Sequence, residues 1–510
     1  MPQPILPSGL SDHLDAAEAN LIAQGVVHPA RVIKHVVNGE HERLLGNAPK
    51  TGQEGGEDEV VTTWQLEAKE LSKNSIPLVI TLALQYSLTL ASVFSAGNLG
   101  SNELAAVSLA GMTANITGYA IYQGLATALD TLCAQAYGSG NKHMVGVHFQ
   151  RMAVFLMVLT VPISIVWMYS EEILKTIIPE DELSRLAGLY LRILVMGAPG
   201  YALFECGKRY TQAQGLFMAS TIVLLICAPL NAFLNYTLVW HPTIGMGFAG
   251  APTAVVIIDY LMPLLLFLYV RFVAGSECWG GFSKRAFTNW WPMIQLALPG
   301  LVMVEAEYLA FEVLTLMASY FSTAHVAAQA IVAQAGSVMY QIPFALSIAA
   351  STRVGTFVGG MSPNAAKITS STSLVMSVVI GTFNGGLLLS TRFLIPQCFT
   401  DDSHVIAIAA AAMPIVGFFQ IFDSISAVAA GVLRGQGRQY VGSYTNLVTY
   451  YVAALPWSWY SGFVLGWEVK GLWSGMAMAL AIIAFVEVLV VLLTNWQRVV
   501  GEARARESWA

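Results

Sequence analysis

The segment LPGLVMVEAEYLAFE, residues 298–312, places Glu305, Glu307 and Glu312 inside an otherwise apolar run. An ionisable side chain in the hydrocarbon of a bilayer costs about 2.5–3.5 kcal/mol, so such groups normally face protein or a water-filled cavity. The run therefore predicts a membrane-spanning helix that carries a proton or cation site. The alternative for each glutamate is a position at the membrane interface or in a structural hydrogen-bond network.

The composition of the whole chain agrees with a membrane protein. Of its 510 residues, 55% are hydrophobic and 11% are charged, whereas soluble domains carry about 25% charged residues. The formal net charge of −6 sums a polar tail with loops on both sides of a membrane, so it indicates no partner, and we expect no nucleic-acid binding. The five cysteines form no CxxC pair, so we expect no metal site and no cofactor.

The chain divides into a polar tail and a long apolar region. Residues 1–70 predict a largely disordered cytosolic tail, with a short amphipathic helix as an option at 11–24. Beyond the tail, runs long enough to cross a hydrocarbon core of about 30 Å recur twelve times. The predicted spans are 74–98, 104–135, 146–169, 186–212, 217–240, 248–273, 291–320, 326–357, 368–390, 404–432, 440–465 and 471–495.

Basic residues test this number of spans. With twelve spans, one side of the membrane receives only Lys175, Arg185, Arg192, Arg392 and Lys470, while the remaining Lys and Arg of the apolar region lie at the other side. Cytosolic loops are enriched in Lys and Arg, so the bias predicts that both termini are cytosolic.

Weak internal repeats indicate two halves. Residues 126–138 align with residues 347–359 at an offset of 221, and Gln214-Gly215 aligns with Gln436-Gly437 at an offset of 222. The offset separates two sets of six spans, and an even number gives both sets the same orientation. We expect an N-terminal lobe at 71–275, a cytosolic linker at 276–290, a C-terminal lobe at 291–496 and a short cytosolic tail at 497–510. The lobes should be related by a pseudo-two-fold axis along the membrane normal, with a cavity between them.

Four ordered motifs carry a family resemblance that covers about residues 70–500. They are ELAAVSLA at 103–110, GLATALDTLCAQAYG at 124–138, QIPFALSIAASTRVG at 341–355 and GVLRGQGRQ at 431–439. Together they resemble the eukaryotic branch of the multidrug and toxic compound extrusion (MATE) family. The resemblance implies an all-α polytopic exporter with twelve transmembrane helices in two six-helix lobes. It also implies exchange of protons, or of sodium in some bacterial relatives, for organic substrates.

The resemblance assigns proton coupling to residues of the C-terminal lobe. The family pattern places glutamates eight and thirteen residues after a proline of the seventh helix, which gives Glu307 and Glu312 after Pro299. Asp423 resembles the acidic position of the tenth helix, and Glu305 has no counterpart. The alternative for Asp423 is an N-cap or a hydrogen bond to a helix break near Pro414 or Gly417.

Helical geometry separates the three glutamates. At about 100° per residue, Glu305 and Glu312 share one face, while Glu307 points nearly the opposite way. Pro299 and Gly300 predict a kink. We therefore expect Glu307 in the cavity and Glu312 toward another helix or the interface, with Glu305 as a further proton-binding or structural group.

The N-terminal half is predicted to lack an equivalent acidic cluster. Gln85 occupies the first helix where some prokaryotic relatives have a carboxylate. Asp130 replaces the glutamate of the family's second-helix motif, and we favour a structural cap or gate contact for it over proton carriage.

Aromatic faces attract organic cations and amides orient polar groups, so both are candidates to line the substrate cavity. For each, ordinary helix packing is the alternative. The candidates are Gln85, Tyr119, Tyr122, Gln123, Tyr308, Tyr340, Gln341, Asn446 and Tyr450.

The predicted function is a secondary active antiporter that exports cationic or amphipathic organic compounds from the cytosol in exchange for protons, by alternating access. The alternative is a lipid-linked precursor flippase with a more cationic cavity. The sequence has no GxxxxGK[ST] loop and no HExxH pair, so an ATP pump and a zinc enzyme are disfavoured. We expect a monomer in the plasma membrane or a vacuole-like organelle, with small organic substrates and the lipid bilayer as partners.

Overall fold

Helices are the regular elements of the described chain, which the computed structural model gives for residues 60–97, 99–177 and 180–508. Residues Thr62–Ala510 form one compact unit, which is the part described below. The amphipathic helix predicted at 11–24 lies outside the described residues. The described residues contain no β-strand, in agreement with the predicted all-α class.

The N-terminal lobe contains six helical passages, of which two are broken. They are α3 (Trp64–Gly97), a second passage made of α4 (Ser101–Ala114), η2 (Asn115–Tyr119), α5 (Ala120–Ala126) and α6 (Ala128–Gly138), α7 (Lys142–Met168), a bent pair of α9 (Asp181–Leu194) and α10 (Ala198–Ala213), α11 (Met218–Trp240) and α12 (Gly250–Phe272). The short α8 (Ser170–Ile177) precedes the pair, whose members meet at 57°.

The C-terminal lobe also contains six helical passages. Its passages are α13 (Trp291–Ser319), α14 (Thr323–Gly359), α15 (Pro363–Ser390), α17 (Ser403–Gln436), a segmented passage of α18 (Gln439–Val448), η6 (Thr449–Ala454), α19 (Leu455–Trp459) and η7 (Tyr460–Val464), and α20 (Glu468–Leu492). The short α16 (Leu394–Gln397) precedes α17, and α21 (Trp496–Ser508) closes the described chain.

Length and hydropathy identify nine of the described helices as able to cross a membrane, or ten with the bent pair. The other two passages are α13, whose three glutamates lower its hydropathy, and the passage from α18 to η7, which π-helical segments interrupt. The twelve passages in two sets of six agree with the prediction.

One predicted boundary differs from the structure. The first helix begins at Trp64, so residues 64–70 of the predicted tail are helical. This extension is polar and was missed because it contributes nothing to the apolar run; its Glu67 is buried by contacts from the other lobe. The C-terminal tail predicted at 497–510 is helical as far as Ser508.

Caps and glycines set the ends of the long helices. Asp402 caps α17 by accepting a hydrogen bond from the His404 N–H at 2.8 Å, which satisfies a donor that the helix itself leaves open. The same helix ends at Gly437, whose φ of 76° suits glycine. In the middle of the lobe, α17 packs against α14, α15 and α20.

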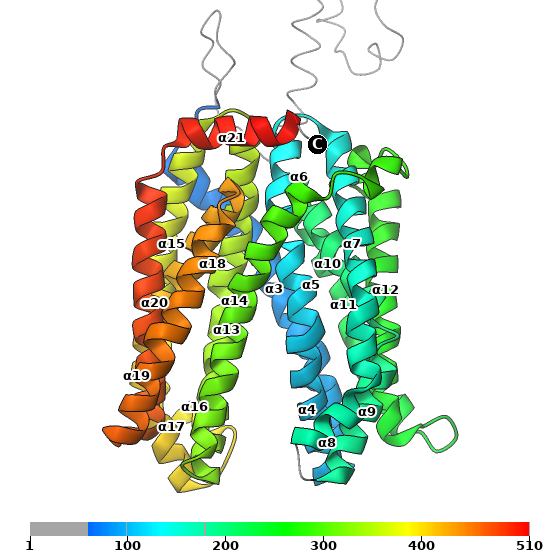
Figure 1. Cartoon of the computed structure of the whole chain (residues 1–510), viewed down its shortest axis with the longest axis vertical. Coiled ribbons are helices and arrows are strands. Elements are labelled where there is room, and N and C mark those ends of the chain that lie inside the picture. Colours follow the sequence, from blue (N-terminus) through cyan, green and yellow to red (C-terminus); the bar gives the residue numbers. More distant parts are fainter. Residues whose placement is uncertain (1–59, 98, 178–179, 509–510) are drawn as a thin grey trace, which may run out of the picture. The chain divides into compact units, whose positions relative to one another are not determined.

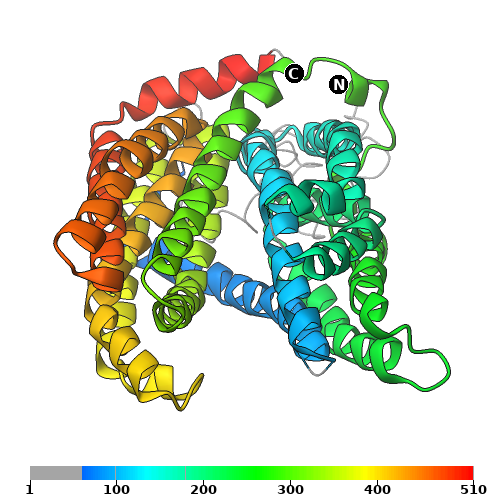
Figure 2. The same cartoon turned by 60° about the horizontal axis from the view of Figure 1, so that its bottom comes forward.

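One end of the bundle concerns the function. Figure 1 shows α21 lying across the end at which α3 begins, and α6, α14 and α17 all finish near the same end. We call it the tail end, and the other the far end. In Figure 2, α3 runs between the two lobes, and it contacts α11 and α12 of its own lobe as well as α14 and α15 of the other.

Candidate transport site

Two carboxylates of the C-terminal lobe, Glu307 on α13 and Asp423 on α17, interact electrostatically. Asp423 is 4% exposed, and its Oδ2 accepts a hydrogen bond from Gln420 Nε2 at 3.4 Å. It lies far inside α17, whose N-cap is Asp402, so the N-cap alternative for Asp423 is wrong. The pairing of Glu307 with Asp423 was predicted from the family pattern, and the structure places both acids within one lobe.

The other two glutamates of α13 have different surroundings. Glu305 is half-buried, its Oε1 is enclosed without a hydrogen-bond partner, and it interacts electrostatically with Tyr308 and Tyr451. Glu312, seven residues after Glu305 and so about two turns further along α13, is half-buried as well. The expected functional separation of Glu307 from Glu305 and Glu312 stays a prediction.

Helix α13 stays helical through Pro299 and crosses the other lobe directly afterwards. A Cβ atom at Gly300 would overlap the Thr127 hydroxyl of α5–α6, and one at Gly124 would lie 2.8 Å from the Leu301 Cα. Only a residue without a side chain permits this approach. Beyond the crossing, Asn446 Nδ2 donates to the Met303 carbonyl at 3.3 Å, which ties α13 to α18.

The predicted cavity residues of the N-terminal lobe fall into packed or paired positions. Tyr122 is buried and donates to Thr160 Oγ1 at 2.9 Å, so it acts in helix packing. The ring of Tyr119 contacts Trp167 and Tyr201. Gln85 donates to Glu205 and accepts from Lys208, and the Gln123 carbonyl accepts from Arg209.

In the C-terminal lobe, the candidates divide between buried and accessible groups. Tyr450 and Asn446 are buried. Tyr340 is half-buried and stacks on Phe344, with ring centroids 5.5 Å apart. Tyr308 is 38% exposed, and Gln341 donates to the Ser337 carbonyl of its own helix.

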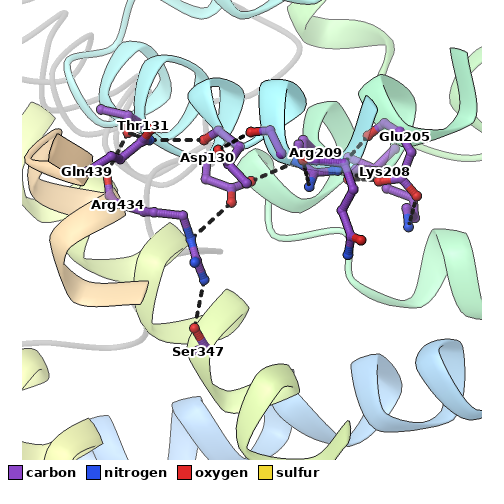
Figure 3. Close-up of polar contacts among 12 residues, drawn as sticks. Asp130, Thr131, Glu205, Lys208, Arg209, Ser347, Arg434 and Gln439 are labelled. Atoms are coloured by element: carbon purple, nitrogen blue, oxygen red, sulfur yellow. Dashed lines mark hydrogen bonds and ion pairs between the residues drawn. The ribbon is translucent and has the colours of Figure 1, made fainter. Parts of the chain in front are cut away.

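An inter-lobe polar network centres on Asp130 (Figure 3). Its Oδ1 lies 3.2 Å from Arg209 Nε of the same lobe, and its Oδ2 lies 3.5 Å from Arg434 Nε of the other lobe. Arg434 also donates to Ser347 at 2.7 Å. Arg209 and Lys208 both pair with Glu205, at 2.7 and 2.5 Å. The buried charges therefore form one connected set in which cations and carboxylates alternate.

Further hydrogen bonds join the lobes beside Asp130. Thr131 donates to the Arg434 carbonyl, Gln439 donates to Thr131 at 3.1 Å, and Gln135 donates to the Gly435 carbonyl at 2.9 Å. Arg506 of α21 reaches both lobes, donating to Gln135 and to the Gln436 carbonyl. Inter-lobe polar contacts thus gather at the tail end.

A second inter-lobe clamp involves Glu67 at the start of α3. Its carboxylate pairs with Arg353 of α14 and accepts from Thr369 of α15 at 2.8 Å and from Thr62 at 2.5 Å. Glu67 is fully buried. The first helix is therefore fixed to the C-terminal lobe at the tail end.

The sequence interpretation did not identify three buried acidic residues. Glu205 on α10, Asp259 on α12 and Glu487 on α20 each stand within a predicted span. The rarity of acids in apolar spans would have identified all three. Glu205 and Asp130 also make the expectation of an N-terminal lobe without an acidic cluster wrong, because the cationic partners Lys208 and Arg209 make such a cluster stable.

Comparison of the sequence with known proteins assigns the chain to a family. Residues 77–237 and 299–460 match the family described as MatE, once in each lobe. The chain is 44% identical to an uncharacterized transporter of Saccharomyces cerevisiae over 86% of this chain, but it spans only 63% of that protein. It is 31% identical to multidrug and toxin extrusion protein 2 of Mus musculus, over 86% of this chain and 77% of that protein.

Solved structures agree with the fold. The crystal structure of the eukaryotic MATE transporter AtDTX14 superposes with a TM-score of 0.82 and 28% identity, covering 88% of this chain and all of that one. The bent form of the Vibrio cholerae MATE transporter VcmN gives 0.74 at 16% identity, over 87% of this chain and 99% of that one, which supports the fold alone. The chain belongs to the MATE family of integral, multi-pass membrane transporters.

Proposed function

We propose that this transporter exports cationic or amphipathic organic compounds in exchange for protons, by alternating access. The observation that carries the proposal is the pair Glu307 and Asp423, two acids of one lobe that interact inside the bundle. Two carboxylates that share a site repel each other when both are ionised, so such a pair readily holds one proton. Proton uptake and release at the pair would change the charge on α13.

The tail end is proposed to face the cytosol. Basic residues are concentrated in the loops of that side, where the positive-inside rule expects them. The proton-rich side would then be the far end, in either the plasma membrane or a vacuole-like organelle.

The polar contacts between the lobes support a state that is closed toward the cytosol. Asp130, Glu67 and Gln135 each connect the lobes at the tail end. In such a state, protons from the far end reach Glu307 and Asp423 and displace the substrate. The lobes then separate at the tail end, protons leave to the cytosol, and a new substrate binds.

The substrate class rests on the acids and on the relatives. Ionised Glu307 offers a negative charge to an organic cation, and the accessible aromatic face of Tyr308 offers a cation–π contact. The name of the mouse relative, a multidrug and toxin extrusion protein, supports a range of organic substrates.

A flippase for lipid-linked anions would need unpaired cations in the cavity. In the network around Asp130, the buried cations Lys208, Arg209 and Arg434 each lie beside Glu205 or Asp130. Their charge is neutralised within the protein, which favours the exporter.

The proposal is tested with purified protein in liposomes, using rhodamine 6G as the cationic probe. An imposed pH gradient should drive accumulation of the probe, and a sodium gradient of equal size should not. Accumulation driven only by sodium, or by neither gradient, would overturn proton exchange.

A further inference from the structure

Glu487, near the end of α20, is a buried acid without a partner. Its side chain is 1% exposed, and neither carboxylate oxygen has a hydrogen-bond partner among the described residues. Its neighbours along the helix are Phe485, Val486 and Val488. An ionised carboxylate buried without a partner is very unfavourable, so this conformation favours the neutral, protonated form of Glu487.

The surroundings of Glu487 connect it to α13. A Cβ atom at Gly442 of α18 would lie 3.0 Å from Glu487 Oε1 and 2.7 Å from the Met303 sulfur. The carboxyl group therefore faces the seam between α18 and α13 near Met303, a residue that precedes Glu307 by one helical turn. Glycine at position 442 leaves room beside it.

The elements packed against α20 present few groups that can interact with this acid. They include α17, α18, α19, η6, η7, α13, α14 and α15. The charged groups that reach Glu487 electrostatically are Arg434 of α17 and Glu307 of α13, and the titratable group is Tyr450 of η6. Arg434 is the one cation in this set.

In this structure the carboxylate partner of Arg434 is Asp130, which belongs to the opposite lobe, and the contact between them is long. The Nε atom of Arg434 lies 3.5 Å from Asp130 Oδ2 and makes no hydrogen bond among the described residues. When the lobes separate at the tail end, this contact must break. Asp130 then keeps Arg209 as its partner, whereas Arg434 would remain as a buried charge without one.

We propose that Glu487 is a second proton carrier, which releases its proton and takes over Arg434 when the tail end opens. In the closed state, Arg434 pairs with Asp130, and Glu487 keeps its O–H bond. In the open state, that O–H bond is broken, the proton passes to water at the tail end, and Arg434 pairs with the Glu487 carboxylate. Charge balances, because the ion pair across the lobes is replaced by one within the lobe and one released proton.

This exchange links opening to proton release. It rests on the proposed proton-driven export, and it gives the direction of that export a structural reason. Opening without deprotonation leaves Arg434 unpaired, and deprotonation without opening leaves Glu487 as an excess negative charge. The protein therefore opens to the cytosol as it releases the proton.

The test measures tail-end opening by the distance between spin labels on His143 of α7 and Lys367 of α15, two exposed residues on different lobes. Glu487→Gln mimics the protonated acid and cannot accept Arg434. We expect its open fraction at neutral pH to fall by roughly tenfold or more, because a buried charge then loses its partner on opening. Glu182→Gln, which alters an exposed ion pair, should leave the open fraction unchanged.

A second variant keeps the test decisive. Arg434→Gln combined with Glu487→Gln removes the charge that needs a partner, so opening should recover relative to Glu487→Gln alone. If Glu487→Gln does not fold, Glu487→Asp takes its place and should open in a pH-dependent way. A wild-type open fraction in Glu487→Gln, no recovery in the double variant, or pH-independent opening of Glu487→Asp would each overturn the proposal.

Transport of rhodamine 6G separates this proposal from the one on which it rests. If a pH gradient drives uptake by the wild type and the spin-label distances of Glu487→Gln equal those of the wild type, the proposal for Glu487 is wrong and proton-driven export stands. If no pH gradient drives uptake, proton-driven export fails, and the label distances still decide whether Arg434 changes partners.

Discussion

Asp130 of α6 and Arg434 of α17 form an ion pair between the two lobes, with 3.5 Å between Oδ2 and Nε. The same carboxylate lies 3.2 Å from Arg209 of its own lobe. One acid therefore lies between two guanidinium groups at a contact between the lobes, which has to break in the proposed alternating access. In the proposed mechanism, this acid and the clamp at Glu67 hold the tail end closed.

Replacing Asp130 with Asn should destabilise the closed state. Removal of one partner from a buried ion pair costs about 3–5 kcal/mol, and the remaining contact of Arg209 with Glu205 should keep the loss near the lower value. We expect a lower midpoint of thermal unfolding in detergent and a larger open fraction at the tail end. Glu182→Gln, in an exposed pair worth about 0–1 kcal/mol, is the control. Equal midpoints for the two variants would contradict the role of Asp130.

The close approach of α6 to α14 gives a second prediction. A Cβ atom at Gly138 would overlap the backbone carbonyl of Thr356. Gly138→Ala should therefore push the lobes apart and lower the free energy of unfolding by about 1–3 kcal/mol. Gly111 of α4 has open space around it, so Gly111→Ala should stabilise the protein by about 0.4–1 kcal/mol. Thermal unfolding compares them, and a loss of stability in Gly111→Ala equal to that in Gly138→Ala would refute the steric reason.

The clamp at Glu67 can be weakened one hydrogen bond at a time. Thr369→Val keeps the shape of the side chain and removes its hydrogen bond to the Glu67 carboxylate, which is worth about 1.5–3 kcal/mol for a charged acceptor. Thr382→Val removes a hydroxyl that is exposed and bonded within its own helix. Protection of the α3 amides at 64–71 from hydrogen exchange should fall in the first variant and not in the second. The clamp is absent if both variants exchange like the wild type.

Docking of α21 should depend on acid pH. Burial would raise the pKa of Glu502, but Arg438 and Arg498 outweigh it and hold this pKa below its ordinary value. A carboxyl group with a lowered pKa stabilises the folded state above its unfolded pKa, and that contribution is lost as the pH falls through the folded value. The protection of residues 496–508 from hydrogen exchange, measured relative to the intrinsic exchange rate at each pH, should therefore be steady from neutral pH to about pH 5 and fall below about pH 4. Glu502→Gln should remove this change, and its persistence in that variant would exclude Glu502 as the cause.

The twelve passages could be predicted from the sequence because each needs a run of fixed length, and α13 was found despite its three glutamates. The extension of α3 from Trp64 to Glu70 was not found, since its helical state is tied to Glu67, which Arg353 and Thr369 hold from distant parts of the chain. Contacts between residues far apart in the sequence cannot be predicted from hydropathy.

The acids of the site were predictable only in part. Glu307 and Glu312 follow a family spacing, Asp423 resembles an acidic position of the family's tenth helix, and Glu305 was considered because it lies in the same run as the first two. Glu487 is flanked by valines and belongs to no motif. Its proposed role depends on the position of Arg434, which the sequence does not reveal. The role of Asp130 likewise depends on which lobe its second guanidinium comes from.

The most direct test of proton exchange at Glu307 and Asp423 follows protons instead of substrate. Liposomes with a pH indicator inside receive a gradient of rhodamine 6G at constant external pH, and the internal pH is recorded. The wild type should move protons against the flow of the probe, while Glu307→Gln and Asp423→Asn should each lose this movement by at least about tenfold, as expected when a proton-transfer group is removed. Wild-type proton movement in both variants would contradict the account.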